Sequence, residues 1–260
     1  MASRKLKLLI WLLATAAADL ASAQRPSALL ERAGRQAEEF ATLFPSLACT
    51  EKLTQVKYGQ GEKIASRRES VFDYLILLET TGDSFTVEES RLEKSRPQKD
   101  PQQALLATTG FAVMQVVFHP FFQGSYDFKE IEPETRDGVT WRRVHFEHLP
   151  GHASPTVLEV KGREYPIAWR GTAWLSPETG AVSRIQTELR EALADIGLES
   201  LTSTVEYGPG AASVTAWVPR LAVVEARTAH QHWRNQHEFS AYRRFEVTSE
   251  QKVIQEPTKQ

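Results

Sequence analysis

The apolar and polar positions at the very start of the chain follow the order of a secretion signal. Basic residues come first, an apolar run covers residues 8–18, and Ala21-Ser22-Ala23 has the small-x-small form at which signal peptidase cuts. The apolar run is shorter than the about 20 residues that a spanning helix needs. We therefore expect residues 1–23 to be a cleaved signal peptide and the mature chain to begin at Gln24, without a membrane-spanning segment and in the periplasm or outside the cell.

The next segment has the periodicity of an amphipathic helix. Ser27 is a favourable N-cap residue, and Pro45 cannot continue a helix, so the pattern predicts a helix between them. Its apolar residues recur at spacings of three and four, which places them on one face: Leu29, Leu30, Ala33, Ala37, Phe40, Ala41 and Phe44.

From Ala48 onward the pattern changes to a period of two, interrupted by Gly, Pro and Asp turns. It predicts about ten strands without alternating helices, an arrangement typical of antiparallel pairing. The clearest hairpin joins Trp169–Leu175 to residues 181–190, where Ser183 and Ile185 are on the face opposite Arg184. The run Leu75-Ile76-Leu77-Leu78 is apolar on both faces, so we expect that strand to be covered on both sides.

Two segments depart from the strand pattern. Residues Gln103 to Phe118 are apolar nearly all round and end before Pro120, which predicts a second helix that is covered on more than one side. Residues 149–166 are rich in proline and glycine and are expected to form a mobile loop.

These elements define the expected fold class. It is mainly β with two or more helices (α+β), an antiparallel sheet curled into an incomplete barrel and packed on helices. Residues 24–260 lie within the size that one large β domain fills, so a single domain is expected.

Composition excludes one class of partner and constrains the core. The net charge is −2, with 31 basic and 33 acidic residues spread along the chain, so no clustered basic face for nucleic acid is expected. Cys49 is the single cysteine, which excludes an internal disulfide. We expect it to be a small buried apolar residue.

The sequence contains little that indicates catalysis. His230 and His232 point to the same face of a predicted strand and are weak candidates for metal ligands, but surface histidines are the commoner case. Motifs for a serine nucleophile, a phosphate loop, a zinc-protease helix and paired cysteines are missing from the sequence. We therefore expect no enzyme and no cofactor, and a metal-dependent enzyme is the least favoured alternative.

The hairpin Gly171-Thr172-Ala173-Trp174 with Pro177-Glu178-Thr179-Gly180, and the ending Phe239 to Val247, resemble secreted proteins with the outer-membrane lipoprotein carrier fold (LolA/LolB-like). The stretch Ala48-Cys49-Thr50-Glu51 before the first strand is similar to the acidobacterial-type branch of that family. The resemblance implies an incomplete barrel wrapped around helices, with an apolar cavity that holds lipid chains.

Two hypotheses for the function follow. The first is a periplasmic carrier or binding protein for lipid acyl chains or a lipoprotein, in which helix 103–118 is a lid. Its apolar groove would be lined by Phe111, Met114, Phe118, Trp141 and Trp174. The alternative is a structural or interaction protein of the cell envelope, whose barrel is filled by these side chains. A groove of several hundred Å³ would favour the carrier.

Overall fold

One antiparallel sheet of ten strands organises the protein. The computed structural model describes residues 27–82, 84–94, 108–160, 163–210, 214 and 216–244, and the predicted signal peptide lies outside them. The strand order is β3-β2-β1-β12-β11-β10-β9-β8-β5-β4, so β3 and β4 lie at its two ends. The strands are β1 (Leu47–Tyr58), β2 (Ile64–Thr81), β3 (Ser84–Glu93), β4 (Tyr126–Arg136), β5 (Val139–His148), β8 (Trp169–Leu175), β9 (Val182–Leu189), β10 (Leu198–Pro209), β11 (Trp217–Thr228) and β12 (His232–Arg244).

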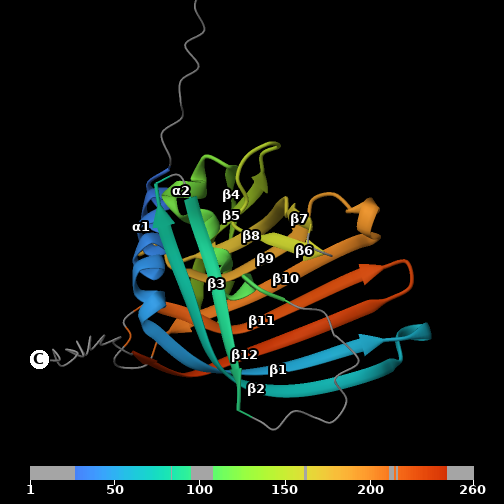
Figure 1. Cartoon of the computed structure of the whole chain (residues 1–260). Coiled ribbons are helices and arrows are strands. Elements are labelled where there is room, and N and C mark those ends of the chain that lie inside the picture. Colours follow the sequence, from blue (N-terminus) through green and yellow to red (C-terminus); the bar gives the residue numbers. More distant parts are fainter. Residues whose placement is uncertain are drawn as a thin grey trace, which may run out of the picture.

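The sheet curls without closing. In Figure 1, the long strand β2 and its partner β3 cross in front of β10 and β11, and helical segments lie inside the curve. Register shifts interrupt several strand pairs, among them β1 with β12 and β10 with β11, and such bulges bend a sheet. The predicted class, an antiparallel sheet curled into an incomplete barrel and packed on helices, is confirmed.

The first predicted helix is present as α1 (Ala28–Leu43). The Ser27 hydroxyl accepts a hydrogen bond from the Leu30 N–H, as the N-cap prediction requires. A 3₁₀ turn, η1 (Phe44–Ser46), follows and contains Pro45. The buried stripe of α1 includes Ala33, Ala37 and Phe40 and covers the helical segment inside the sheet.

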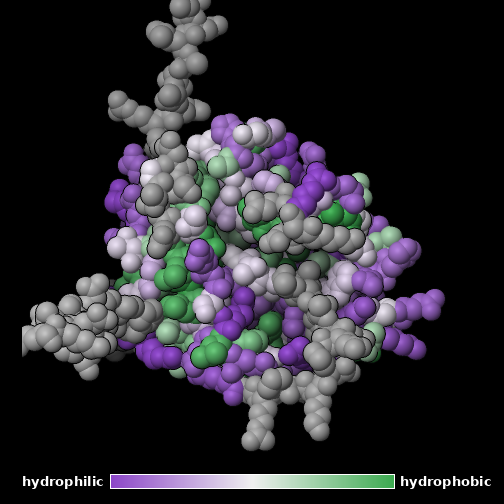
Figure 2. All heavy atoms as spheres, in the orientation of Figure 1, coloured by the Kyte–Doolittle hydropathy of each residue, from purple (hydrophilic) through white to green (hydrophobic). Residues whose placement is uncertain are grey.

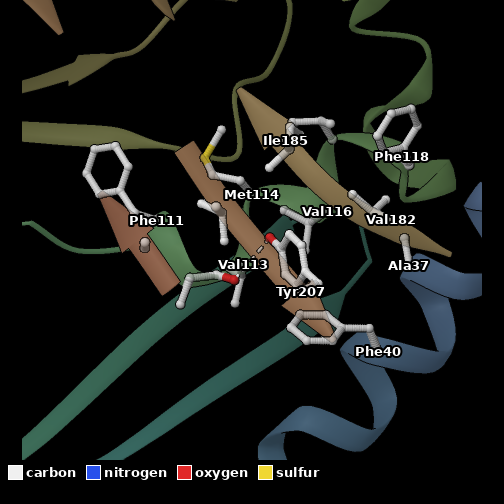
Figure 3. Packing of buried hydrophobic residues seen from close by; sticks show 14 of the residues in the cluster. Ala37, Phe40, Phe111, Val113, Met114, Val116, Phe118, Val182, Ile185 and Tyr207 are labelled. Carbon is white, nitrogen blue, oxygen red and sulfur yellow. Dashed lines mark hydrogen bonds between the residues drawn. The ribbon is translucent and has the colours of Figure 1, made fainter. Parts of the chain in front are cut away.

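The second predicted helix differs from the expectation. Its first part, residues 103–107, lies outside the described residues, and residues 108–110 are not helical. The 3₁₀ segment η3 (Phe111–Phe118) follows, and then the short helix α2 (Pro120–Gln123). All eight residues of η3 are buried, so the expected cover on several sides is confirmed. The hydroxyl of Tyr207 from β10 accepts from the Gln115 N–H and donates to the Ala112 carbonyl, at 3.1 Å each (Figure 3). This buried side chain satisfies polar groups that an α-helix would pair internally.

Two other local expectations are corrected. The segment 149–166, predicted to be a loop, contains a separate hairpin of β6 (Val157–Val160) and β7 (Arg163–Pro166). In β2, Ile76 and Leu78 are buried but Leu77 is 38 % exposed, so the strand is not covered fully on both faces. None of the helices in the described part of the chain is long and apolar enough to cross a membrane.

The turn between β8 and β9 places α1 on the sheet. Gly180 has φ +78°, and a methyl group on it would lie 2.6 Å from the backbone of Arg32 and Ala33. Gly138, in the two-residue turn between β4 and β5, has φ +76° with nothing within 4 Å of such a methyl.

We expect Gly180→Ala to destabilise the protein more than Gly138→Ala. Both changes carry the left-handed backbone cost of about 1–2 kcal/mol, but only the first also forces α1 away from the turn. Urea denaturation of the two variants checks this, and equal losses would mean that α1 does not constrain the turn.

Candidate functional site

A cavity of about 670 Å³ lies between β3, the start of η3, the segment that leads into β6, and β10. Its walls come from stretches far apart in the sequence, which the curl of the sheet brings together. The lining residues are Phe85, Thr86, Val87, Glu88, Thr109, Gly110, Phe111, Ser154, Pro155, Thr156, Val157, Leu158, Ile167 and Leu201. Most of these side chains are apolar, and the remainder are chiefly hydroxyl-bearing.

The cavity belongs to a face with apolar surface. Figure 2 shows hydrophobic residues gathered between α1 and β3 and again near the β6–β7 hairpin, within a surface that is otherwise mainly hydrophilic. Val157, one of the lining residues, is 47 % exposed. Val157 therefore adds apolar surface to the rim of the cavity.

The structure separates the predicted groove residues into three groups. Phe111 lines the cavity and contacts Trp169 edge to face, with ring centroids 6.0 Å apart. Met114 and Phe118 are almost fully buried in the core that η3 shares with α1, β9 and β10 (Figure 3). These two side chains fill the centre of the curled sheet instead of lining a groove.

Trp141 and Trp174 do not line the cavity. The ring of Trp174 lies between Arg143 and Arg184, at 5.5 and 5.2 Å from their guanidinium carbons, and its indole donates to Glu134. Its neighbour Ala173 belongs to the core, so Trp174 faces the other side of the sheet. Trp141 contacts Trp217 edge to face. Strand alternation separates these two tryptophans from the inner face.

The weak metal candidates are not brought together as ligands. His232 stacks on Tyr58, and its Nδ1 lies 2.7 Å from a carboxylate oxygen of Glu62. His230 lies in the exposed turn before β12. Within the described residues, no group of three or more His, Cys, Asp or Glu side chains has the arrangement to hold a metal ion.

A buried ion network, made of Glu51, Glu89, Arg91 and His237, lies beside the cavity wall. Arg91 Nε donates to Glu51 Oε2 at 2.6 Å and its Nη2 to Glu51 Oε1 at 3.1 Å, while Nη1 lies 2.7 Å from Glu89 Oε2. His237 Nδ1 lies 2.7 Å from Glu51 Oε1. Glu51 is completely buried, so its charge depends on these partners.

The partners decide the protonation state of the network. Burial would raise the pKa of Glu51, but the hydrogen bonds from His237 and Arg91 outweigh it and hold the pKa below its ordinary value. Burial would lower the pKa of Arg91, and the charge of Glu89 with the hydrogen bond to Glu51 raises it instead. The carboxylate and the guanidinium are therefore both charged at neutral pH.

The network holds the segment before η3 at two points. The Gly110 N–H donates to Glu89 Oε1 at 2.6 Å, and the Thr108 hydroxyl lies 2.8 Å from His237 Nε2. Asn235 donates to the same hydroxyl at 3.0 Å, so two side chains of β12 hold Thr108. The segment that begins η3 is thus fastened to β3 and β12.

The chain Thr108, His237, Glu51 has the order of a nucleophile, base and orienting carboxylate. Thr108 is only 7 % exposed, does not line the cavity, and has its hydroxyl engaged on both sides. A substrate carbonyl cannot approach that oxygen in this arrangement. The geometry indicates that Thr108 fastens the segment before η3 to β12.

Sequence reasoning missed this network although a signal was present. Cys49, Glu51 and Leu53 alternate on the inner face of β1, so a glutamate occupies a position that the period of two assigns to the core. Such an inward charge requires a partner. Cys49 is buried, as expected, and burial raises its pKa to about 12, which makes the thiol unreactive.

The fold defines an open, curled antiparallel sheet around a helical centre, with one apolar cavity described above. No family model matches the chain, and no curated protein does so. Similar solved structures exist, with low sequence identity.

One is a LolA superfamily protein from Nitrosomonas europaea, with 9 % identity, 84 % of this chain and 94 % of that chain covered, and a TM-score of 0.39. A DUF1329 family protein from Desulfovibrio piger has 9 % identity, coverage of 85 % and 95 %, and a TM-score of 0.41. A domain from Vibrio parahaemolyticus, described as an outer membrane lipoprotein-sorting protein, has 12 % identity, coverage of 85 % and 95 %, and a TM-score of 0.41.

Proposed function

We propose that this protein is a non-catalytic carrier or binding protein of the periplasm that holds a lipid chain, free or attached to a protein, in the cavity between β3 and the β6–β7 hairpin. The observation that carries the proposal is the cavity itself. Its volume of about 670 Å³ falls within the range of about 300–1,000 Å³ that small-molecule sites occupy. The predicted signal peptide supports the location.

The ligand would enter a cavity that exists before binding. The sequence hypothesis assigned the opening movement to residues 103–118, but the described part of that segment lies in the core and is fastened by the ion network. Apolar burial at about 25 cal/mol per Å² supplies the affinity. Val157, at the start of β6, presents a half-exposed apolar side chain at this cavity.

The second candidate function is a structural or interaction protein with a filled barrel. The complete burial of Met114, Val117 and Phe118 favours it, because η3 occupies the centre that a larger lipid cavity would need. The two functions differ in whether the remaining cavity takes up a ligand.

Uptake of a neutral fluorescent monoacylglycerol by the purified mature protein tests the proposal. We expect saturable binding to the wild type and a co-purifying lipid in native mass spectrometry of protein taken from its source. Val157→Trp fills the cavity mouth from a half-exposed position, so it should reduce binding at least about tenfold while the melting temperature changes little.

The surface change Val139→Trp serves as a control, since Val139 is 48 % exposed and does not line the cavity. It should bind as the wild type does. Lack of binding by the wild type, together with empty protein in native mass spectrometry, would instead favour the filled barrel.

A further inference from the structure

The described residues that line the cavity carry negative charge without a balancing positive charge. The cavity's described lining includes a single charged residue, Glu88, whose side chain is exposed on β3. Arg91, two strand positions beyond Glu89, already binds two carboxylates. Within the part of the chain that the structure describes, the residues that line the cavity include no lysine, arginine or histidine.

Two carboxylates lie next to the wall. Glu51 and Glu89 share one guanidinium, so the side chains of these three residues carry one excess negative charge. Glu89 also occupies the Gly110 N–H, which is the donor at the start of η3 that an anion would otherwise use.

Two hydroxyl side chains of the described wall form hydrogen bonds within the protein. Ser154 donates to the Ile167 carbonyl at 2.7 Å, and Thr156 accepts from the Trp169 indole at 2.9 Å. Most of the other side chains in the described wall are apolar. An anionic head group placed here would lose its hydration without a compensating cation.

We propose that the cavity selects single-chain lipids whose head group carries no negative charge and excludes fatty acids and phosphate-bearing lipids. This inference rests on the proposed function and specifies its ligand class. The residue that sets the selectivity is Glu88, supported by the carboxylate of Glu89 behind the wall.

Competition against the bound fluorescent monoacylglycerol tests the inference with hexadecanol, hexadecylamine and hexadecanoate. These competitors share a chain and differ in head-group charge. We expect the alcohol and the amine to displace the probe, and hexadecanoate at neutral pH to bind at least about tenfold more weakly in low salt.

Charge reversal at one position makes the test specific. Glu88→Lys should raise the affinity for hexadecanoate several-fold and leave hexadecanol unchanged, a gain that a merely misfolded protein cannot give. Glu199→Lys, the same change at an exposed residue that lines no part of this cavity, should leave all three affinities unchanged.

Binding of hexadecanoate as tight as that of hexadecanol by the wild type would overturn the charge selectivity and leave the carrier function intact. Failure of the monoacylglycerol probe and of all three competitors to bind would overturn both.

Discussion

Glu51→Ala is expected to lower the free energy of unfolding by about 3–5 kcal/mol, because it leaves Arg91 and His237 buried without their shared carboxylate. Arg91 keeps Glu89, but both oxygens of Glu51 take part in short hydrogen bonds that no other group replaces. Urea denaturation monitored by tryptophan fluorescence measures the loss. The wall segment that begins η3 should loosen as well, since His237 and Glu89 hold it.

The matched control is Glu188→Gln, which removes the carboxylate of an ion pair with Arg170 in which both side chains are about half exposed. It should change stability little, because exposed pairs contribute weakly. Equal losses in the two variants would mean that the buried network adds nothing beyond a surface pair.

The cost of Glu51→Ala should also depend on pH. The pKa of Glu51 is lower in the folded protein than its ordinary value, so its contribution is complete above that ordinary value and is lost as pH falls through the folded pKa. The difference between wild type and variant should therefore be constant from neutral pH down to about pH 5 and shrink below about pH 4. A difference that grows with acid would contradict a charged Glu51.

Val117→Asp is expected to prevent folding or to yield insoluble protein. Val117 is completely buried in η3, and a buried unpaired carboxylate costs several kcal/mol of the about 5–15 kcal/mol that stabilises a domain. Expression, solubility and circular dichroism measure the outcome. The result would establish that η3 is core and not a movable cover.

Val157→Asp is the matched change at the cavity, since Val157 is 47 % exposed. Its stability should stay close to that of the wild type, while uptake of the monoacylglycerol probe should fall at least about tenfold because a charge enters the apolar wall. Folded and soluble Val117→Asp protein with unchanged probe binding would contradict the assignment of η3 to the core.

Local patterns in the sequence determined much of the fold. The spacing of apolar residues after Ser27 determined α1, and the period of two determined most strands, including the hairpin of β8 and β9. These features depend on contacts between residues near each other in the chain, so propensity and alternation are enough to predict them.

Other features depended on distant partners. The sequence predicted a helix over residues 103–118, but residues 111–118 form a 3₁₀ segment, in which Tyr207 from β10 bonds the Gln115 N–H and the Ala112 carbonyl. Trp141 and Trp174 were expected in the groove, whereas strand alternation and the two arginines beside Trp174 place them on the other face. Aromatic residue type alone does not specify the side of a sheet.

The candidate site also combines a feature that the sequence predicts with features that depend on distant contacts. Phe111 could be proposed from the sequence as a groove residue because an apolar run predicts burial, but burial does not distinguish a filled core from a cavity wall. Only the tertiary structure decided that Phe111 borders empty space while Met114 does not. The contacts of Glu51 with Arg91 and His237 also depend on the tertiary structure. Arg91 lies 40 positions and His237 lies 186 positions from Glu51 in the chain, and strand pairing brings the three side chains together.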